Sequence, residues 1–266
     1  LAVPLLHLCL ALVGCSSPSA PADGGSTDAE RRDAFIDAPA RDAPGADAPG
    51  ADVSSPPPPP PPTECVPLPA PTGTVVRVDP SMAAALPSMV RGASADTTFL
   101  LADGTYRTSG DEASRRIRVE APGITIRSAS GNPDAVNIDG EYVTAEVITV
   151  HAANVTLAEL TITHAVDHGV HVTPFGGGPD VVGFRMYRVR VLDCGEQFLK
   201  VNPPGSRDAW ADDGIVECSH FELTDAGRPH VERATGGCYT GGIDAHSARG
   251  WVVRQNRFVG IYCAGE

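Results

Sequence analysis

Apolar and polar residues alternate in short stretches from about residue 96 to the end of the chain. The segments 117–126 and 148–157 match at an offset of 31 residues and carry apolar residues at the same alternating positions. A period of two residues is typical of β-strands that bury one face, whereas an α-helix needs a period of 3.6 residues. The pattern therefore predicts strands, and the offset predicts that they recur as repeats.

A four-position apolar pattern, at relative positions 0, 2, 5 and 7, begins at Val155, Phe184, Val216 and Val253. The gap between the second and third positions predicts a turn, and Gly, Asn, Asp and Pro interrupt the pattern at short intervals. The four starts are 29, 32 and 37 residues apart. A β-sandwich would not repeat one pattern in this way, but a parallel solenoid with loops of variable length would. We therefore expect an all-β fold over residues 73–266.

Two further segments carry a family resemblance. Residues 99–106, Phe-Leu-Leu-Ala-Asp-Gly-Thr-Tyr, resemble the opening coil of many pectate-lyase-like right-handed β-helix proteins, and residues 136–140 resemble the end of their next coil. The resemblance covers about residues 96–266 and implies a right-handed single-stranded parallel β-helix. The superfamily contains lyases, hydrolases, epimerases and non-catalytic surface proteins, so the fold alone does not imply one activity. No terminal cap follows the strand-like residues 260–263, and we expect further coils beyond residue 266.

The N-terminal residues predict an anchor. Residues 5–13 form an apolar run that is too short to span a bilayer but suits a signal peptide. The run ends in Leu-Val-Gly-Cys at residues 12–15, which resembles the bacterial lipobox. The resemblance implies a lipoprotein signal peptide over residues 1–14 and lipidation of Cys15. It also implies a place in the bacterial cell envelope, facing the periplasm or the exterior. The alternative is an ordinary secretory signal that contains a cysteine.

Residues 15–72 predict a disordered stalk. Asp-Ala-Pro recurs at Asp37, Asp42 and Asp47, and residues 56–62 are all proline. Acidic repeats repel one another and cannot form a core. A run of seven prolines favours polyproline II and would extend roughly 20 Å. The alternative is a ligand for a proline-binding domain.

One row of polar residues is the candidate site. Counting onward from each repeat places Val170, Leu199, Ile243 and Ile261 on the inward face of equivalent strands. The residues that follow them then point outward in a single row: His171, Lys200, Asp244 and Tyr262. Neighbouring strands lie about 4.8 Å apart, so these side chains would converge. We expect a catalytic role for them, with Lys200 or His171 as base and Tyr262 as proton donor. The alternative is an ordinary solvated face.

Other polar residues flank this row. His168, Gln197 and His246 are candidate substrate-binding residues, and Asp212 with Asp213 is a candidate Ca²⁺ site, or simply a turn before glycine. The resemblance implies Ca²⁺, because glycan lyases of this superfamily use Lys or Arg as base and often Ca²⁺ to neutralise the substrate. One such lyase family has a Glu-rich strand running into Lys and then an Arg-His pair. Here Glu196 and Lys200 are reminiscent of it, but no Arg-His pair follows.

Charge and cysteines narrow the function classes. The net charge is −13 and no basic block occurs, which disfavours a nucleic-acid partner. An acidic surface also repels polyanionic glycans unless a local basic site or a cation compensates. Cysteines in an exported protein predict disulfides. The spacing of the last four predicts bridges between adjacent coils, and an odd number of cysteines follows the lipidated one: Cys65, Cys194, Cys218, Cys238 and Cys263.

The leading hypothesis is a surface-anchored, monomeric, carbohydrate-active protein of the cell envelope. A polysaccharide lyase or hydrolase acting on an acidic or neutral glycan fits a lysine beside histidine and aspartate. The first alternative is a non-catalytic adhesin or glycan-binding protein, although aromatic residues make up only 5% of the chain. The second is a structural envelope protein with no ligand.

Overall fold

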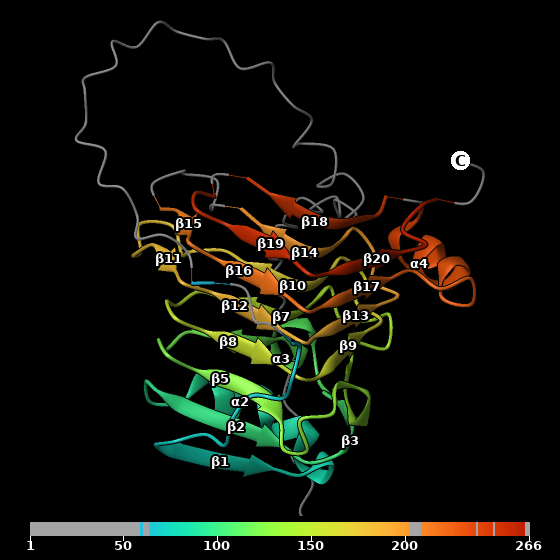
Figure 1. Ribbon diagram of the computed structural model, residues 1–266. Coiled ribbons are helices and arrows are strands. Elements are labelled where there is room, and N and C mark those ends of the chain that lie inside the picture. The colour runs from blue at the N-terminus through green and yellow to red at the C-terminus, as the bar shows by residue number, and fades with distance from the viewer. Residues whose placement is uncertain (1–58, 61–63, 203–208, 238, 247, 264–266) are drawn as a thin grey trace, which may run out of the picture. The chain divides into compact units, whose positions relative to one another are not determined.

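The computed structural model describes residues 59–60, 64–202, 209–237, 239–246 and 248–263 (Figure 1). The predicted signal peptide, the lipidated Cys15, most of the predicted stalk and Cys238 lie outside the described residues. Within the described part of the chain, no helix is long and apolar enough to cross a membrane.

Short parallel strands in three larger sheets dominate the structure, which confirms the all-β prediction (Figure 1). Sheet A contains β1 (Thr74–Val78), β2 (Thr97–Leu101), β5 (Thr125–Ser128), β8 (Thr156–Ala158), β12 (Arg185–Tyr187), β16 (Ile215–Glu217) and β19 (Val252–Arg254). Sheet B contains β3 (Gly104–Arg107), β6 (Val136–Asp139), β9 (Thr161–Thr163), β13 (Arg190–Leu192), β17 (His220–Glu222) and β20 (Arg257–Val259). Sheet C contains β4 (Ile117–Val119), β7 (Glu146–Val150), β10 (His168–Val172), β14 (Gln197–Val201) and β18 (Gly241–Ala245).

The remaining elements are short. Strands β11 (Val181–Val182) and β15 (Ala211–Asp212) form a separate parallel pair. The helices are η2 (Pro80–Ala85), α2 (Leu86–Arg91), α3 (Glu112–Arg115), η3 (Pro133–Ala135) and α4 (Arg228–Thr235). Helix α4 lies in the connection from β17 to β18, which is the longest connection from sheet B to sheet C.

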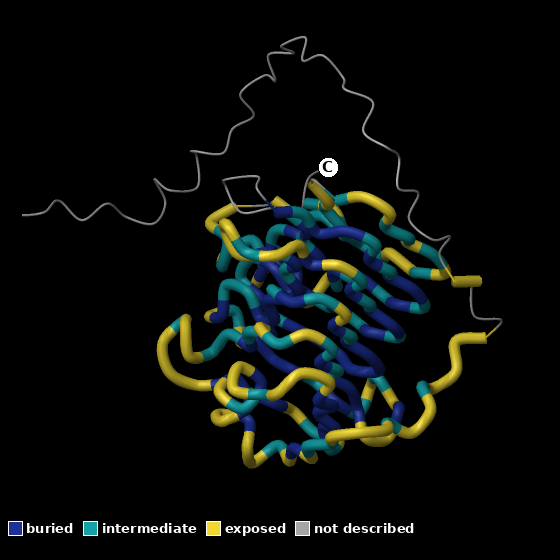
Figure 2. The backbone as a smooth tube through the Cα atoms, turned by 90° about the vertical axis from the view of Figure 1, so that its left-hand side faces the viewer, coloured by how far each residue is buried: buried dark blue, intermediate teal, exposed yellow. Residues whose placement is uncertain are grey.

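From β5 onward the chain visits sheets A, B and C in turn, and each strand pairs with the strand one circuit later. Leu157 pairs with Met186, and Met186 pairs with Val216. The inward residues of all three sheets form one continuous hydrophobic core. Figure 2 shows these buried positions recurring along stacked strands, with the exposed positions mainly in the connections.

The corner between sheets A and B uses the same backbone conformation in successive circuits. Glu159, Arg188, Cys218 and Gln255 have φ angles of 57°, 52°, 55° and 55°. This left-handed region costs a non-glycine residue roughly 1–2 kcal/mol. The stacked circuits therefore impose the corner, because nothing in the identities of these four residues favours it.

Register was predicted correctly in part. Ile117 pairs with Ile148 and Ile126 pairs with Leu157, which confirms the offset of 31 residues. The alignment of Val216 with Phe184 was wrong, because Val216 pairs with Met186 instead, two residues away. A slip of two residues keeps the same side chains inward, so the hydrophobic pattern could not detect it.

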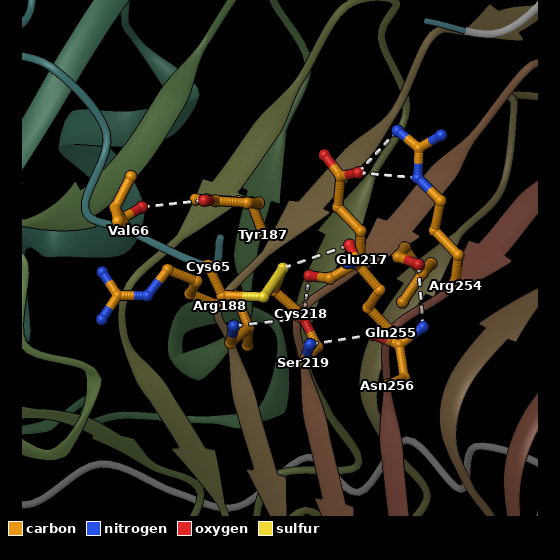
Figure 3. The surroundings of a disulfide bond; sticks show 12 residues. Cys65, Val66, Tyr187, Arg188, Glu217, Cys218, Ser219, Arg254, Gln255 and Asn256 are labelled. Atoms are coloured by element: carbon orange, nitrogen blue, oxygen red, sulfur yellow. Dashed lines mark hydrogen bonds and ion pairs between the residues drawn. A yellow bond between two sulfur atoms is a disulfide. The ribbon is translucent and has the colours of Figure 1, made fainter. Parts of the chain in front are cut away.

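Residues 65–69 belong to the folded structure and not to a stalk that ends at residue 72. Cys65 forms a disulfide with Cys218, the residue directly after β16, and the Tyr187 hydroxyl donates to the Val66 carbonyl at 2.7 Å (Figure 3). Arg127 donates to the carbonyls of Leu68 and Pro69 at 2.9 and 2.6 Å. These residues attach the N-terminal segment, defined here as residues 65–69, to the outer face of sheet A.

The disulfide whose two cysteines are both described does not join adjacent coils, contrary to the prediction from the spacing. Cys65–Cys218 joins residues separated by 153 positions in sequence. Cys194, expected to pair with a neighbouring coil, is a free buried thiol, and burial raises its pKa to about 12. Cys263 is disulfide-bonded. Spacing of about one coil therefore gave the wrong prediction for Cys194, whose side chain lies in the hydrophobic core.

Candidate functional site on sheet C

A row of outward-facing polar residues crosses sheet C. Lys200 pairs with His171 on one neighbouring strand and with Asp244 on the other, as the sequence predicted. The row continues from His171 through Thr149 to Arg118. We call these five residues the polar row. The inward residues beside them also pair as predicted: Val170, Leu199 and Ile243.

Lys200 is held by a carboxylate. Its Nζ donates to Oδ2 of Asp244, and both side chains are largely buried. The other oxygen of Asp244, Oδ1, lies 2.8 Å from Nε2 of the exposed His246. Since Asp244 binds both, the candidate base and a candidate substrate-binding residue are linked through one carboxylate.

His171 lies between two oxygen atoms. Its Nδ1 is 2.6 Å from Oε1 of Glu146, and its Nε2 is 2.5 Å from Oδ1 of Asn202. The second oxygen of Glu146 is 2.7 Å from Arg116. Burial alone would raise the pKa of Glu146, but the hydrogen bond and charge of His171, with the charge of Arg116, lower the pKa to about 2. Glu146 is therefore an anion that fixes the orientation of the His171 ring.

His168 and Gln197 are buried at the start of their strands. Burial, with the charge of His171 adding to it, lowers the pKa of His168 to about 4, so the imidazole is neutral at pH 7. The rings of His168 and His171 meet edge-on with centroids 5.3 Å apart. Gln197 is 4% exposed, and its Oε1 has no hydrogen-bond partner among the described residues.

An exposed aromatic ring lies beside one end of the polar row. Phe175 stacks on His151 with centroids 4.1 Å apart and planes 12° apart. The guanidinium carbon of Arg118 lies 5.9 Å from the same ring centroid. The sequence reasoning missed this group, as it missed Glu146 and Asn202. Continuing the row from His171 by two strands toward the N-terminus, through Thr149, would have found Arg118.

Tyr262 is not in the polar row, contrary to the prediction. It follows β20, and its backbone N–H donates to the Gly260 carbonyl in a turn. The centroid of its ring lies 3.9 Å from the guanidinium carbon of Arg228, on helix α4. Gly260 has a φ of 63°, and after it the described residues contain no further strand of sheet C to align Ile261 and Tyr262 with the row. A proton-donor role for Tyr262 at Lys200 therefore has no geometric support.

Asp212 and Asp213 do not fit a Ca²⁺ site. Oδ1 of Asp212 accepts from the Arg249 backbone N–H at 2.9 Å, and Oδ2 accepts from Arg249 Nε at 3.0 Å. A guanidinium thus takes the position that a cation would need. Asp213 is a corner residue with a φ of 54°. The pair lies on β15 and the turn after it, and β15 pairs with β11, outside sheet C.

The comparisons with known proteins do not assign the chain to a family. No protein-family model matches the chain, and neither a curated protein nor a solved structure matches it. The function must therefore be argued from the residues of this chain.

Proposed function

We propose that residues 73–266 form a right-handed single-stranded parallel β-helix. Strands that visit sheets A, B and C in a fixed order, with parallel pairing between successive circuits, support this proposal. Parallel crossover connections are right-handed in about 98% of cases.

The same proposal includes a lipid anchor at Cys15 in a bacterial cell envelope. It is supported by the apolar run at residues 5–13 and the lipobox-like residues 12–15. In a bacterial expression host, labelled fatty acid should enter the wild-type chain but not Cys15→Ala. Equal labelling of the two would rule out the anchor.

The function that the geometry supports best is cleavage of a uronate-containing polysaccharide by β-elimination on sheet C. The observation that carries this proposal is the register that lines up His171, Lys200 and Asp244 on adjacent strands. Lys200, whose ammonium is paired with Asp244, would first have to lose a proton, and its amine would then remove the proton from the carbon beside the substrate carboxylate. The electrons of that C–H bond form a carbon–carbon double bond, and the glycosidic oxygen leaves. His246, which contacts the same carboxylate as Lys200, is the candidate donor of a proton to that oxygen.

Arginine side chains at the polar row provide the local positive charge that an acidic chain needs to bind a polyanion. Arg118 belongs to the row, and Arg116 binds Glu146 beside it. Each is paired with a carboxylate: Arg118 with Glu120 at 3.5 Å, and Arg116 with Glu112 at 2.9 Å. An incoming uronate would have to exchange with these carboxylates, which favours a polymer that makes several contacts at once.

Glycan binding without cleavage is the second candidate. It is favoured by Phe175, which is 40% exposed and stacked on His151 beside Arg118. A flat ring beside a cation suits the apolar face of an acidic sugar.

A panel of uronate and neutral polysaccharides, read at 235 nm where unsaturated products absorb, distinguishes the two candidates. Cleavage predicts rising absorbance with wild type and a loss of that signal in Lys200→Ala. Retention on immobilised glycan with no absorbance change would favour binding alone. Neither signal with any glycan would contradict both candidates.

A further inference from the structure

We propose that Glu146, His168 and His171 form a transition-metal site that binds one Zn²⁺ ion. Each of the three residues offers one ligand atom, and these atoms lie within 4.8 Å of one another. The proposal concerns metal binding alone and does not depend on whether the protein acts on a glycan.

The backbone holds the three ligands in place. Glu146 and His168 are register partners on the adjacent strands β7 and β10, and His171 lies three residues after His168 on the same strand. Hydrogen-bonded strands fix the separation of their side chains more firmly than loops do. His168 and Glu146 are also largely buried, with side-chain exposures of 10% and 15%. Little reorganisation is therefore needed to bring the ligands onto one ion.

The partners of His171 select the nitrogen that would bind the metal. Oδ1 of Asn202 faces Nε2 at 2.5 Å, so Nε2 carries a proton and donates it. Nδ1 faces the carboxylate of Glu146 at 2.6 Å. Two electron-rich atoms at this distance share a proton. Two ligands of one Zn²⁺, each about 2.0–2.1 Å from the ion, lie roughly 3.3 Å apart, so Nδ1 and the carboxylate oxygen must separate by less than about 1 Å to admit the metal. Zn²⁺ would replace that proton, while Asn202 holds the ring from the other side as outer partners of metal-binding histidines do.

The donor set favours zinc over calcium. Two imidazoles and one carboxylate are common ligands of Zn²⁺, whereas Ca²⁺ takes oxygen ligands almost exclusively. A fourth ligand could be water or Glu196, whose Oε2 lies 3.9 Å from Nε2 of His168. The positive charge of Lys200 on the next strand is balanced by Asp244. The cluster therefore presents one anion and two neutral nitrogens to an ion.

A matched pair elsewhere in the molecule provides the control. His220 and Glu222 on sheet B make the same contact, with Nε2 and Oε2 2.6 Å apart. Among the groups of described residues that could hold a metal, only the sheet C cluster adds a second imidazole to such a pair. The His220–Glu222 pair should therefore not contribute to zinc binding.

The test is a calorimetric titration of the full chain with Zn²⁺ after removal of metals with EDTA. We expect one Zn²⁺ per chain, no competition from Ca²⁺, and no change in affinity in His220→Gln. Glu146→Gln and His168→Gln should each weaken binding at least tenfold, and Asn202→Ala about tenfold by releasing the ring of His171. Circular dichroism of each variant checks the fold. If a ligand variant does not fold, the affinity of Asn202→Ala for Zn²⁺ tests the proposal in its place. Absence of Zn²⁺ binding by the folded wild type, or wild-type affinity in both Glu146→Gln and Asn202→Ala, would overturn the proposal.

Discussion

Sheets A and C both stack charged residues on their outer faces, but in the described part of the chain only the charges of sheet A hold a distant segment. On sheet A, Glu159 binds Arg127 at 2.6 Å and Arg188 at 3.4 Å. Two strands further along the same sheet, Glu217 binds Arg185 at 2.8 Å and Arg254 at 2.7 Å. The N-terminal segment lies over these groups and is fixed to them by Arg127, Tyr187 and the disulfide of Cys65.

On sheet C, the described partners of the polar groups come from the sheet itself or from residues next to its strands. Lys200 binds Asp244 within the row, and His171 binds Glu146 and Asn202. The described part of the chain places no distant segment on this network in the way that residues 65–69 lie on sheet A. We therefore expect the charges of sheet A to contribute to stability, and those of sheet C to contribute less.

The largest stability effect is expected at Glu159. Its side chain is fully buried between two arginines, so Glu159→Ala leaves two cations without their anion. Removal of one member of a buried ion pair costs about 3–5 kcal/mol. Urea unfolding should show this loss, whereas Glu120→Ala, which removes partly exposed pairs with Arg91 and Arg118, should cost less than about 1 kcal/mol. Equal losses would mean that burial does not distinguish the two faces.

The disulfide of sheet A provides the next test. Cys65→Ser should lower the free energy of unfolding by about 2–5 kcal/mol, because the bond closes a loop of 153 residues. Proteolysis of the variant should also cut residues 65–69 first. Unchanged stability with a resistant segment would show that hydrogen bonds alone attach it.

Neighbouring residues on β14 test sheet C. Leu199 is fully buried, so Leu199→Ala should cost about 2–5 kcal/mol by leaving a cavity. Lys200→Ala should reduce glycan cleavage by roughly 10²-fold, the usual contribution of a general base, and leave the fold intact. Unfolding caused by Lys200→Ala, with no effect of Leu199→Ala, would contradict the register on which the site is built.

A carboxylate–imidazole pair on sheet B should show the smallest effect. Burial raises the pKa of Asp139, but hydrogen bonds from His164 and the Glu141 N–H lower the pKa by more than burial raises it. The net pKa is therefore below 3.8. The ionised carboxylate therefore contributes stability above the unfolded pKa of 3.8 and loses it as pH falls through the lower folded pKa. Asp139→Asn should cost on the order of 1 kcal/mol at pH 7. That difference should shrink in urea unfolding as the pH falls below 3.8, and a difference that does not change with pH would point to a loss of packing instead.

The sequence predicted the strands and part of the site because both depend on the two-residue period. The offset of 29 residues that relates Leu157 to Met186 also relates His171 to Lys200, so one repeat length set both pairings. The prediction of site residues failed where the repeat ended. Tyr262 lies beyond the last described strand, and no strand of sheet C remained to place it in the row.

The partners of the site were harder to predict. Counting by twos from Ile148 assigns Glu146 to the inward face, yet its carboxylate contacts outward-facing His171. Glu146 is the first residue of β7. At the end of a strand, the alternation of side chains between the inward and outward faces is less strict. Attachment of residues 65–69 was also not predicted, because a proline-rich sequence does not show that its carbonyls accept hydrogen bonds from a distant arginine.

The most direct test of the difference between the two faces is urea unfolding of Arg127→Met beside Lys200→Met. Both changes replace a largely buried cation with an apolar side chain of similar length. We predict that Arg127→Met lowers the free energy of unfolding by about 3–5 kcal/mol, because Glu159 stays buried and the N-terminal segment loses its anchor. Lys200→Met should cost less than about 1 kcal/mol, because Asp244 keeps His246 and remains partly exposed to water. A loss for Lys200→Met as large as that for Arg127→Met would contradict the account, because the charges of sheet C would then be structural as well.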